Sequence, residues 1–345
     1  MRGMSSVDGA LPTSSGPARW ARIVECIRDA ETIAIAGHTN PDGDALGTAL
    51  GLGLAIRERH PEKRVSFLLA DRAPVPRILR FLPHAEEFIP GSDYAGTPDL
   101  FIAVDAPTLA RLELAAPVAE RARRRAVIDH HPAECEYTDA VVREPDAAAA
   151  ALLVADLLFC HGVPISAEVA TCLFTGLVTD TGRFQYQSAT SEAFACAALL
   201  VQAGADPARI ALEVYQSQRI EYLRLEALVM NRIETVADGR VAYSFAKNAD
   251  LRAFGVGYDE CDGLIDLVRQ VAGVEVALFV REGSTPGMVR GNLRSKYGHD
   301  VSTVAQRFDG GGHAAAAGFS FHGSVEEVLG AVLPELEALV GRESR

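Results

Sequence analysis

Three side chains of types that bind metal ions lie close together in the stretch AIAGHTNPDGDALG, residues 34–47. They are His38, Asp42 and Asp44. Imidazole and carboxylate groups are common ligands of divalent cations. Because a short apolar run precedes them, we expect them just beyond the end of a β-strand. Three ligands are too few to close a metal site, so other parts of the chain must supply the rest.

More acids and imidazoles follow later apolar runs. Asp105 ends the run DLFIAVD, Asp129, His130 and His131 end the run RRAVIDHH, and Asp180 follows LFTGLVT. Each motif alone has an ordinary structural explanation, because PDGD is typical of a turn and an Asp after a strand often caps a helix. Ligands of parallel sheets bind at the carboxyl ends of the strands. The joint occurrence of these motifs therefore favours a single site at that edge.

The elements that position these residues alternate in type. Between Glu31 and Asp129, short apolar runs (TIAIA, VSFLL, DLFIAVD, RAVID) are separated by helical stretches such as residues 45–59. Fully apolar strands between helices are typical of a parallel sheet covered on both faces. Residues 167–179 read as a buried helix, and a second helix should begin with Thr190 or Ser191 as N-cap and end at Gly204.

The C-terminal part has a different pattern. Residues 215–231 contain neither Gly nor Pro and favour a helical connector. After it, RVAYSFA, VEVALFV and GMVRGNL read as strands, with helices over 259–271, 301–307 and 324–340. We therefore predict an α/β protein whose active site lies in the cleft between two domains. The predicted parts are a disordered tail (1–17), a parallel-sheet domain (18–214), the connector (215–231) and a smaller α/β domain (232–345).

Composition narrows the class of protein. The 345 residues are 48% hydrophobic and 23% charged, as in globular proteins of about two domains. A net charge of −13 excludes a broad basic surface for long double-stranded nucleic acid, and the basic run RARRR (121–125) reads as a solvated helix end. No apolar run of about 20 residues and no signal sequence is present, and the six cysteines form no motif. We expect a cytoplasmic protein with reduced thiols and no membrane contact.

The candidate ligands indicate a reaction class. Their number is about what two divalent ions require when some carboxylates bridge them, and the donor set suits Mn²⁺ best, then Mg²⁺. Such an ion pair generates hydroxide at neutral pH and stabilises attack on phosphorus. Two ions would also offset the carboxylate charge, so that an anionic substrate can bind locally. The predicted ligands are His38, Asp42, Asp44, Asp105, His130 and Asp180.

These motifs resemble a known family. HTNPDGDALG, VDAP, DHH and TDTGRF are similar, in order and spacing, to the four motifs of the DHH phosphoesterases. RGNLRS and GGGHAAAAG resemble motifs of the DHH-associated domain, so the resemblance runs from about Trp20 to the C-terminus. It is greatest to the bacterial members that hydrolyse short oligoribonucleotides and linear dinucleotides to mononucleotides, and 3′-phosphoadenosine 5′-phosphate (PAP) to AMP.

The resemblance also implies roles for individual residues. Asp105 and Asp180 would bridge the two ions, Asp129 would orient a ligand imidazole, and His131 would face the phosphate or the leaving group. The remaining implied ligands are His38 and Asp42 for one ion, and Asp44 and His130 for the other.

In the second domain, the resemblance implies a substrate-binding site. The backbone of the glycine triplet would form an anion-binding nest, and neighbouring side chains would hold phosphate. Short RNA or nucleotides are the expected binding partners, and a homodimer is compatible with the sequence. The implied substrate-binding residues are Arg294, Ser295, Gly310, Gly311, Gly312 and His313.

Several alternatives remain open. A cyclic-dinucleotide phosphodiesterase fits the same motifs. A manganese inorganic pyrophosphatase shares the first-domain motifs but has a different signature in its second domain, so GGGHAAAAG argues against it. A RecJ-type exonuclease needs an added oligonucleotide-binding domain, for which 345 residues leave no room. A nucleotide-binding regulator without activity is disfavoured because all six ligand positions are filled.

Overall fold

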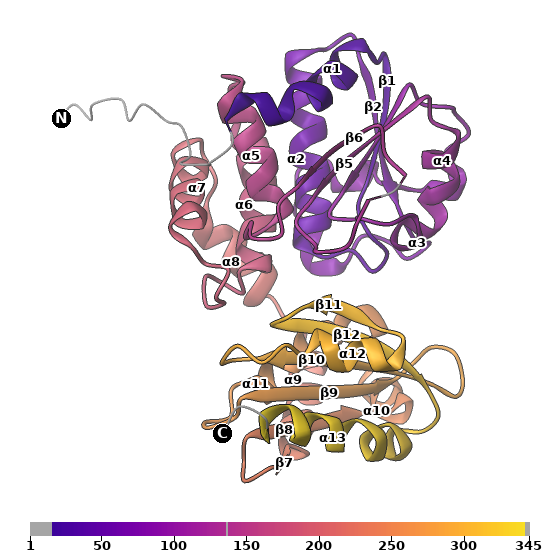
Figure 1. Ribbon diagram of the computed structural model, residues 1–345, viewed down its shortest axis with the longest axis vertical. Helices are drawn as coiled ribbons and strands as arrows, with labels where there is room; N and C mark the ends of the chain where they lie inside the picture. The colour runs from indigo at the N-terminus through magenta and orange to yellow at the C-terminus, as the bar shows by residue number, and fades with distance from the viewer. Residues whose placement is uncertain (1–15, 136, 342–345) are drawn as a thin grey trace, which may run out of the picture. The chain divides into compact units, whose positions relative to one another are not determined.

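The computed structural model describes residues 16–135 and 137–341, which form two compact units, residues 1–217 and 218–345 (Figure 1). The tail predicted over residues 1–17 lies almost entirely outside the described part. Its last residue already belongs to a 3₁₀ turn, Pro17–Trp20, whose Trp20 side chain is buried in the core. We describe each unit by itself.

The first unit contains a parallel sheet, as the sequence predicted, but it has six strands, two of which, Ile89–Pro90 and Ala140–Arg143, were not predicted. Its strand order is β3-β2-β1-β4-β5-β6, so the chain moves outward from β1 in one direction and then from β4 in the other. Such a reversal leaves a crevice at the carboxyl ends of the two central strands. The strands are β1 (Thr32–Ala36), β2 (Arg64–Leu69), β3 (Ile89–Pro90), β4 (Leu100–Val104), β5 (Arg124–Asp129) and β6 (Ala140–Arg143).

Helices cover both faces of this sheet (Figure 1). In β1, Ile33 and Ile35 face one apolar core, and Ala34 and Ala36 face another. This alternation explains why the strands read as continuous apolar runs. The first core includes α1 (Ala21–Asp29), α2 (Gly43–Arg59), α5 (Ala150–Cys160), α6 (Ala167–Asp180), α7 (Ser191–Gln202) and α8 (Pro207–Tyr215); the second includes α3 (Leu109–Leu112) and α4 (Ala116–Arg121).

Helices α2 and α6 approach each other closely because glycine lies at their contact. A Cβ atom at Gly47 would overlap the carbonyl oxygen of Cys172, and one at Gly176 would lie 2.7 Å from Asp44 Oδ1. Any larger side chain would push the helices apart. Both helices carry predicted metal ligands, Asp44 and Asp180, so this packing sets how near those carboxylates come.

The second unit contains a mixed six-stranded sheet of order β11-β12-β10-β9-β8-β7, in which only β8 and β9 are parallel. One face packs on α12 (Ser302–Ala305) and α13 (Val325–Gly341); at β8 and β9 the other packs on α9 (Ile220–Asn231), α10 (Asn248–Phe254) and α11 (Ile265–Arg269). The strands are β7 (Glu234–Val236), β8 (Val241–Ala246), β9 (Val276–Glu282), β10 (Met288–Ser295), β11 (Gly311–His313) and β12 (Ala316–His322).

The structure differs from the expected connector helix over 215–231. Helix α8 ends at Tyr215 and α9 begins at Ile220. The Leu212 carbonyl accepts hydrogen bonds both from the Gln216 N–H and from the hydroxyl of Ser217, which helps to end the helix there. Leu225 of α9 is buried in the core of the second unit, so most of the predicted connector belongs to that unit.

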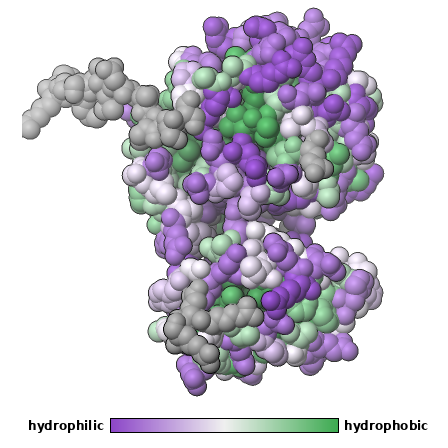
Figure 2. Space-filling view, viewed as in Figure 1, coloured by the Kyte–Doolittle hydropathy of each residue, from purple (hydrophilic) through white to green (hydrophobic). Residues whose placement is uncertain are grey.

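Three further features of the protein concern its surface, its cysteines and its apolar helices. The face seen in Figure 2 is mostly hydrophilic, with an apolar patch on the first unit. All six cysteines are free thiols. No described helix is by itself long and apolar enough to cross a membrane, and α7 and α8 meet that criterion only as a pair bent by 108°.

Candidate active site

The predicted ligands of the first unit converge at the crevice between β1 and β4. His38 follows β1, Asp105 follows β4 directly, and His130 follows β5. Asp180 is the last residue of α6, one residue inside the helix rather than after it. Two groups of three have ligand atoms within 4.8 Å of one another: His38 with Asp42 and Asp105, and Asp44 with His130 and Asp180.

Hydrogen bonds orient the two imidazoles. Nδ1 of His38 donates to the Thr39 carbonyl at 2.7 Å, and Nδ1 of His130 donates to the Ala147 carbonyl at 3.1 Å. A carbonyl oxygen only accepts, so Nδ1 carries a proton in each ring, and Nε2 is the nitrogen left for a metal ion. Both Nε2 atoms point at Asp105, which lies 3.2 Å from His38 and 3.3 Å from His130. This is the arrangement of imidazoles that ligate a metal ion.

Asp105 has one carboxylate oxygen toward each imidazole. Its Oδ1 is buried and has no hydrogen-bond partner among the described residues, although charged oxygens in protein interiors normally have donors. Its backbone is left-handed, with φ of 54°, a conformation that Asp tolerates better than most residues. Burial would raise the pKa of Asp105, but His130, His131 and His38 hold it well below its usual range. A buried anionic oxygen without a donor fits a bridging ligand of two cations.

Asp44 is fully buried and rigidly held. It accepts hydrogen bonds from the Thr48 hydroxyl at 2.9 Å and from the backbone N–H groups of Ala150 and Ala151 at 2.6 and 2.9 Å. The last two are the first residues of α5, where the helix dipole stabilises a negative charge. Burial and the neighbouring charges of Asp105 and Asp180 nevertheless raise the pKa of Asp44 well above its usual range.

Asp180 and Asp42 complete the two groups. Asp180 Oδ2 lies 3.4 Å from His130 Nε2, and burial together with the charge of Asp105 raises the pKa of Asp180 to about 7. Asp42 caps α2: its Oδ1 accepts from the N–H groups of Asp44 and Ala45. It therefore performs the ordinary structural role of such a residue and still lies 3.8 Å from His38 Nε2.

Asp129 and His131 form a separate pair beside Asp105. Asp129 Oδ1 accepts from His131 Nδ1 at 2.9 Å, and Asp129 Oδ2 accepts from the His131 backbone N–H at 3.1 Å. Burial lowers the pKa of His131, but Asp105 and Asp129 outweigh it and raise the value to about 9. Asp129 thus orients the second imidazole of DHH rather than the predicted ligand His130.

Arg111 is a site residue that the sequence analysis missed. Its Nη1 lies 2.8 Å from His131 Nε2, and its carbonyl accepts from the Thr39 N–H. The contact with Nε2 requires that nitrogen to be unprotonated, so Arg111 opposes the two carboxylates that favour the charged imidazole. If an anion lay between them, Arg111 Nη1 and a protonated His131 Nε2 could both donate a hydrogen bond to it. The sequence feature that could have indicated Arg111 is its position as a basic residue on the first helix after Asp105.

The predicted substrate-binding residues of the second unit lie on different faces of its sheet. Arg294 on β10 pairs with Ala316 on β12, which pairs with His313 on β11, so the two polar residues lie in one row of one sheet face. Ser295 is the next residue along β10, so its side chain lies on the opposite face, where it is 5% exposed. The two side chains therefore do not share a face, and the Ser295 hydroxyl has no hydrogen-bond partner among the described residues, so its role in binding substrate stays a prediction.

The glycine triplet lies at the edge of the second sheet, and its expected role as an anion nest stays a prediction. The Gly310 N–H donates to the Ala305 carbonyl, while Gly311 and Gly312 belong to the edge strand β11. A Cβ at Gly310 would overlap the Gly318 carbonyl, so close packing on β12 accounts for this glycine. Gly312 has φ of 136°, which few other residues adopt.

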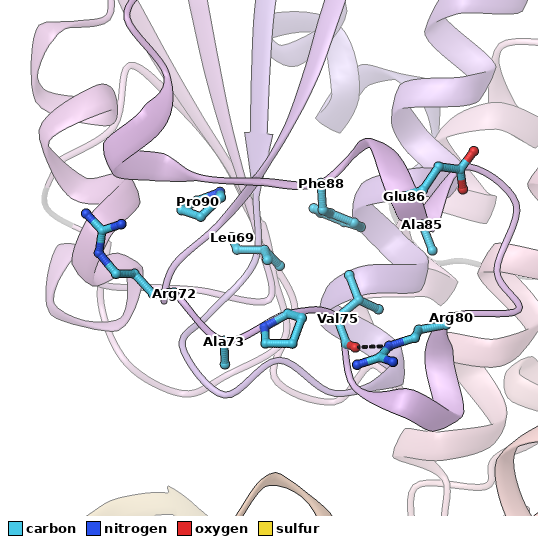
Figure 3. Close-up of a pocket in the computed structure, with 10 residues that line it drawn as sticks. Leu69, Arg72, Ala73, Val75, Arg80, Ala85, Glu86, Phe88 and Pro90 are labelled. Carbon is cyan, nitrogen blue, oxygen red and sulfur yellow. Dashed lines mark hydrogen bonds between the residues drawn. The ribbon is translucent and has the colours of Figure 1, made fainter.

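A cavity of about 440 Å³ in the first unit is a separate feature (Figure 3). Its walls are mainly apolar, with Leu69, Val75 and Phe88, and its polar groups are Arg72, Arg80 and Glu86. Arg80 Nε donates to the Val75 carbonyl at 2.8 Å. None of the predicted site residues lines this cavity, so the candidate chemistry lies elsewhere.

Comparison with known proteins agrees with this geometry. The DHH family, N-terminal domain, matches residues 32–177, and the DHHA1 domain matches residues 238–342. The bifunctional oligoribonuclease and PAP phosphatase NrnA of Thermus thermophilus is 31% identical over 339 residues, 96% of this chain and 98% of that protein. The protein of the same name in Bacillus subtilis is 27% identical, covering 90% of this chain and 95% of that protein.

One solved structure is similar over nearly the whole chain. An exopolyphosphatase-related protein from Bacteroides fragilis is 26% identical, with a TM-score of 0.86, and covers 95% of this chain and 99% of that one. The two family models match one unit each, and the relatives cover nearly the whole chain. The chain belongs to the DHH family of phosphoesterases and carries a DHHA1 domain after its N-terminal domain.

Proposed function

We propose that this protein uses two divalent metal ions to hydrolyse short oligoribonucleotides and linear dinucleotides to mononucleotides, and PAP to AMP. The observation that carries the proposal is the buried Asp105 carboxylate. Its two oxygens face the oriented imidazoles of His38 and His130, and its Oδ1 makes no hydrogen bond among the described residues. The names of the Thermus and Bacillus relatives, which this chain matches over nearly their whole length, support the substrates.

The residues divide into two ligand groups that share carboxylates. His38 and Asp42 would hold one ion, and Asp44 and His130 the other, with Asp105 and Asp180 between them. Carboxylate-rich groups with one imidazole each favour Mn²⁺, then Mg²⁺. When bound, the ions lower the pKa of a water molecule and neutralise charge on the phosphoryl oxygens. The pKa values of Asp44 and Asp180 are raised because these carboxylates are buried close to other negative charges, which bound cations would neutralise.

His131 and Arg111 are the cationic groups nearest to this cluster. Asp129 fixes the His131 ring through Nδ1, so Nε2 is the nitrogen that can donate a proton to a leaving oxygen. Arg111 beside Nε2 can bind a phosphoryl oxygen and hold it next to that proton. Together they would bind the developing negative charge and protonate the product.

In the DHHA1 domain, Arg294 and His313 would bind substrate phosphate, since they share one row of the same sheet face. The charge of the whole chain limits how much more it can bind. At −13, the protein repels each added nucleotide that finds no further cation. We therefore expect the highest kcat/KM for substrates of about two to five nucleotides, removed one at a time.

One substrate panel tests the proposal. Purified protein with Mn²⁺ or Mg²⁺ is assayed against pApA, a labelled oligoribonucleotide ladder up to about a 24-mer, PAP, cyclic di-AMP and pyrophosphate, with products separated by chromatography. We expect short RNA and PAP to be cleaved and the 24-mer to be poor. Exclusive turnover of cyclic di-AMP or of pyrophosphate would establish one of the alternative activities, and no cleavage of short RNA or PAP would refute the proposal.

A further inference from the structure

Two arginines face each other across neighbouring strands of the second unit. The register of β9 and β10 places Arg281 directly opposite Arg290. Side chains opposite one another in an antiparallel pair have Cβ atoms about 5 Å apart, and like charges at that distance are unfavourable. A folded protein keeps such a pair when something else compensates the charge.

Little within the unit compensates it. Arg281 is only 6% exposed, and its Nε is buried without a hydrogen-bond partner. Among the described residues, its one ion pair is with Asp262, at 3.7 Å, whose side chain is 54% exposed, so the pair contributes little. Its guanidinium also lies 5.7 Å from the centre of the Tyr258 ring, a cation–π contact near the limit of that interaction. Arg290 Nε is also buried without a partner, and Arg290 forms no ion pair among the described residues. Two guanidinium groups thus share at most one weak carboxylate.

The sheet surface beside the pair has room for a ligand. The residues of β12 on the same face are Ala316, Gly318 and Ser320, all of them small and accessible. The apolar core on that face contains residues from β8 and β9 but none from β10, β11 or β12. Arg290 and Arg294 lie on this open face, four residues apart, about 14 Å along the strand.

We propose that Arg281 and Arg290 form a second phosphate subsite, which binds a substrate phosphate other than the one being hydrolysed. The inference rests on the proposed function and refines its substrate class. Nucleotides with a 5′-terminal phosphate, such as pApA and PAP, are preferred over the same molecules without it. A phosphate placed between the two guanidinium groups accepts from both and removes their repulsion.

The test compares two dinucleotides that differ by one phosphate. With Mn²⁺, wild-type protein should cleave pApA with a kcat/KM at least about tenfold above that for ApA, the value of one charge-assisted hydrogen bond. Arg290→Gln should lose most of this preference, and Arg290→Lys should keep part of it. Arg252→Gln removes an exposed arginine of the same unit and should keep all of it. Equal cleavage of both dinucleotides by wild-type protein, or an unchanged preference in Arg290→Gln, would overturn the subsite.

A binding measurement separates failure of the subsite from failure of the proposed function. In EDTA, where metal-dependent hydrolysis stops, calorimetric titration should show pApA binding wild-type protein more tightly than ApA does, and Arg290→Gln binding both alike. If neither dinucleotide is cleaved with metal, the proposed function fails while this result still decides the subsite. Equal binding of the two dinucleotides by wild-type protein would refute the subsite even if both are cleaved.

A third measurement excludes a purely structural role. Because Arg290→Gln removes a like-charge contact, its melting temperature in phosphate-free buffer should equal or exceed that of wild-type protein. A fall larger than that of Arg252→Gln would show that Arg290 supports the fold instead and would overturn the proposal.

Discussion

The acid cluster should make the metal-free protein less stable as the pH rises. An acid whose pKa is raised on folding keeps its proton longer in the folded state, so the stability it contributes is present at low pH and lost toward the folded pKa. Asp180 is such a group, with a pKa of about 7 in place of 3.8. His131, with a pKa of about 9, acts in the same direction. The lowered pKa of Asp105 affects only more acidic conditions.

The size of the effect follows from the two pKa values of Asp180. Its retained proton contributes roughly 2 to 3 kcal/mol more to the free energy of unfolding at about pH 5 than at about pH 8. For a unit of this size, each kcal/mol changes the melting temperature by about 2 to 4 °C. In EDTA, wild-type protein should therefore melt about 5 to 10 °C lower at the higher pH. Asp180→Asn cannot lose this proton, so its melting temperature should fall by less.

Metal addition should reverse the trend. Mn²⁺ competes with protons for the same carboxylates, so it should raise the melting temperature of wild-type protein more at about pH 8 than at about pH 5. A free concentration of about 100 Kd corresponds to about 2.7 kcal/mol. The assay is thermal unfolding followed by circular dichroism, with and without Mn²⁺. An equal increment at both pH values, or the same pH dependence in wild-type protein and Asp180→Asn, would show that this cluster does not bind the ion.

Three further changes test other parts of the site and fold. Asp105→Asn should lower kcat/KM about 1000-fold or more with circular dichroism unchanged, whereas the exposed control Glu120→Gln should keep full activity. His313→Ala should raise KM about tenfold while kcat stays nearly constant, and a loss confined to kcat would place it in the chemical step. Gly47→Ala should destabilise the protein by about 1 to 3 kcal/mol, because the added methyl group overpacks against α6. The control is Gly330→Ala, whose methyl group meets no neighbour. Equal unfolding curves for the two variants would contradict this packing argument.

The first sheet could be predicted from the sequence because its strands are buried on both sides. Each of the four predicted runs has an apolar centre, and an acid or imidazole ends it or follows it at the carboxyl edge of the sheet. Strands β11 and β12 could not be predicted in this way. Their residues are mainly Gly and Ala, which are poor strand formers, and their conformation depends on pairing with β10.

The residues missed in the sites depend on contacts between distant parts of the chain. Arg111 lies 20 residues before His131, and only the fold brings them together. Arg281 ends an apolar strand, and its position opposite Arg290 follows from the strand register alone. Ser295 was assigned to the substrate site because it ends the RGNLRS motif, and the motif alone did not show that its side chain and that of Arg294 face opposite sides of the strand.

Burial of Asp44 lowers the stability of the metal-free first unit but prepares the carboxylate for its proposed function. The N-terminus of α5, the Thr48 hydroxyl and the close contact of α2 with α6 all hold this carboxylate in a place without solvent. Without a cation, such a carboxylate is unfavourable, as its raised pKa shows. With a cation, the same rigid surroundings mean that no side chain must be reordered on binding, so more of the binding energy is retained. The site is thus preformed for a positive charge, and that charge contributes part of the stability of the folded unit.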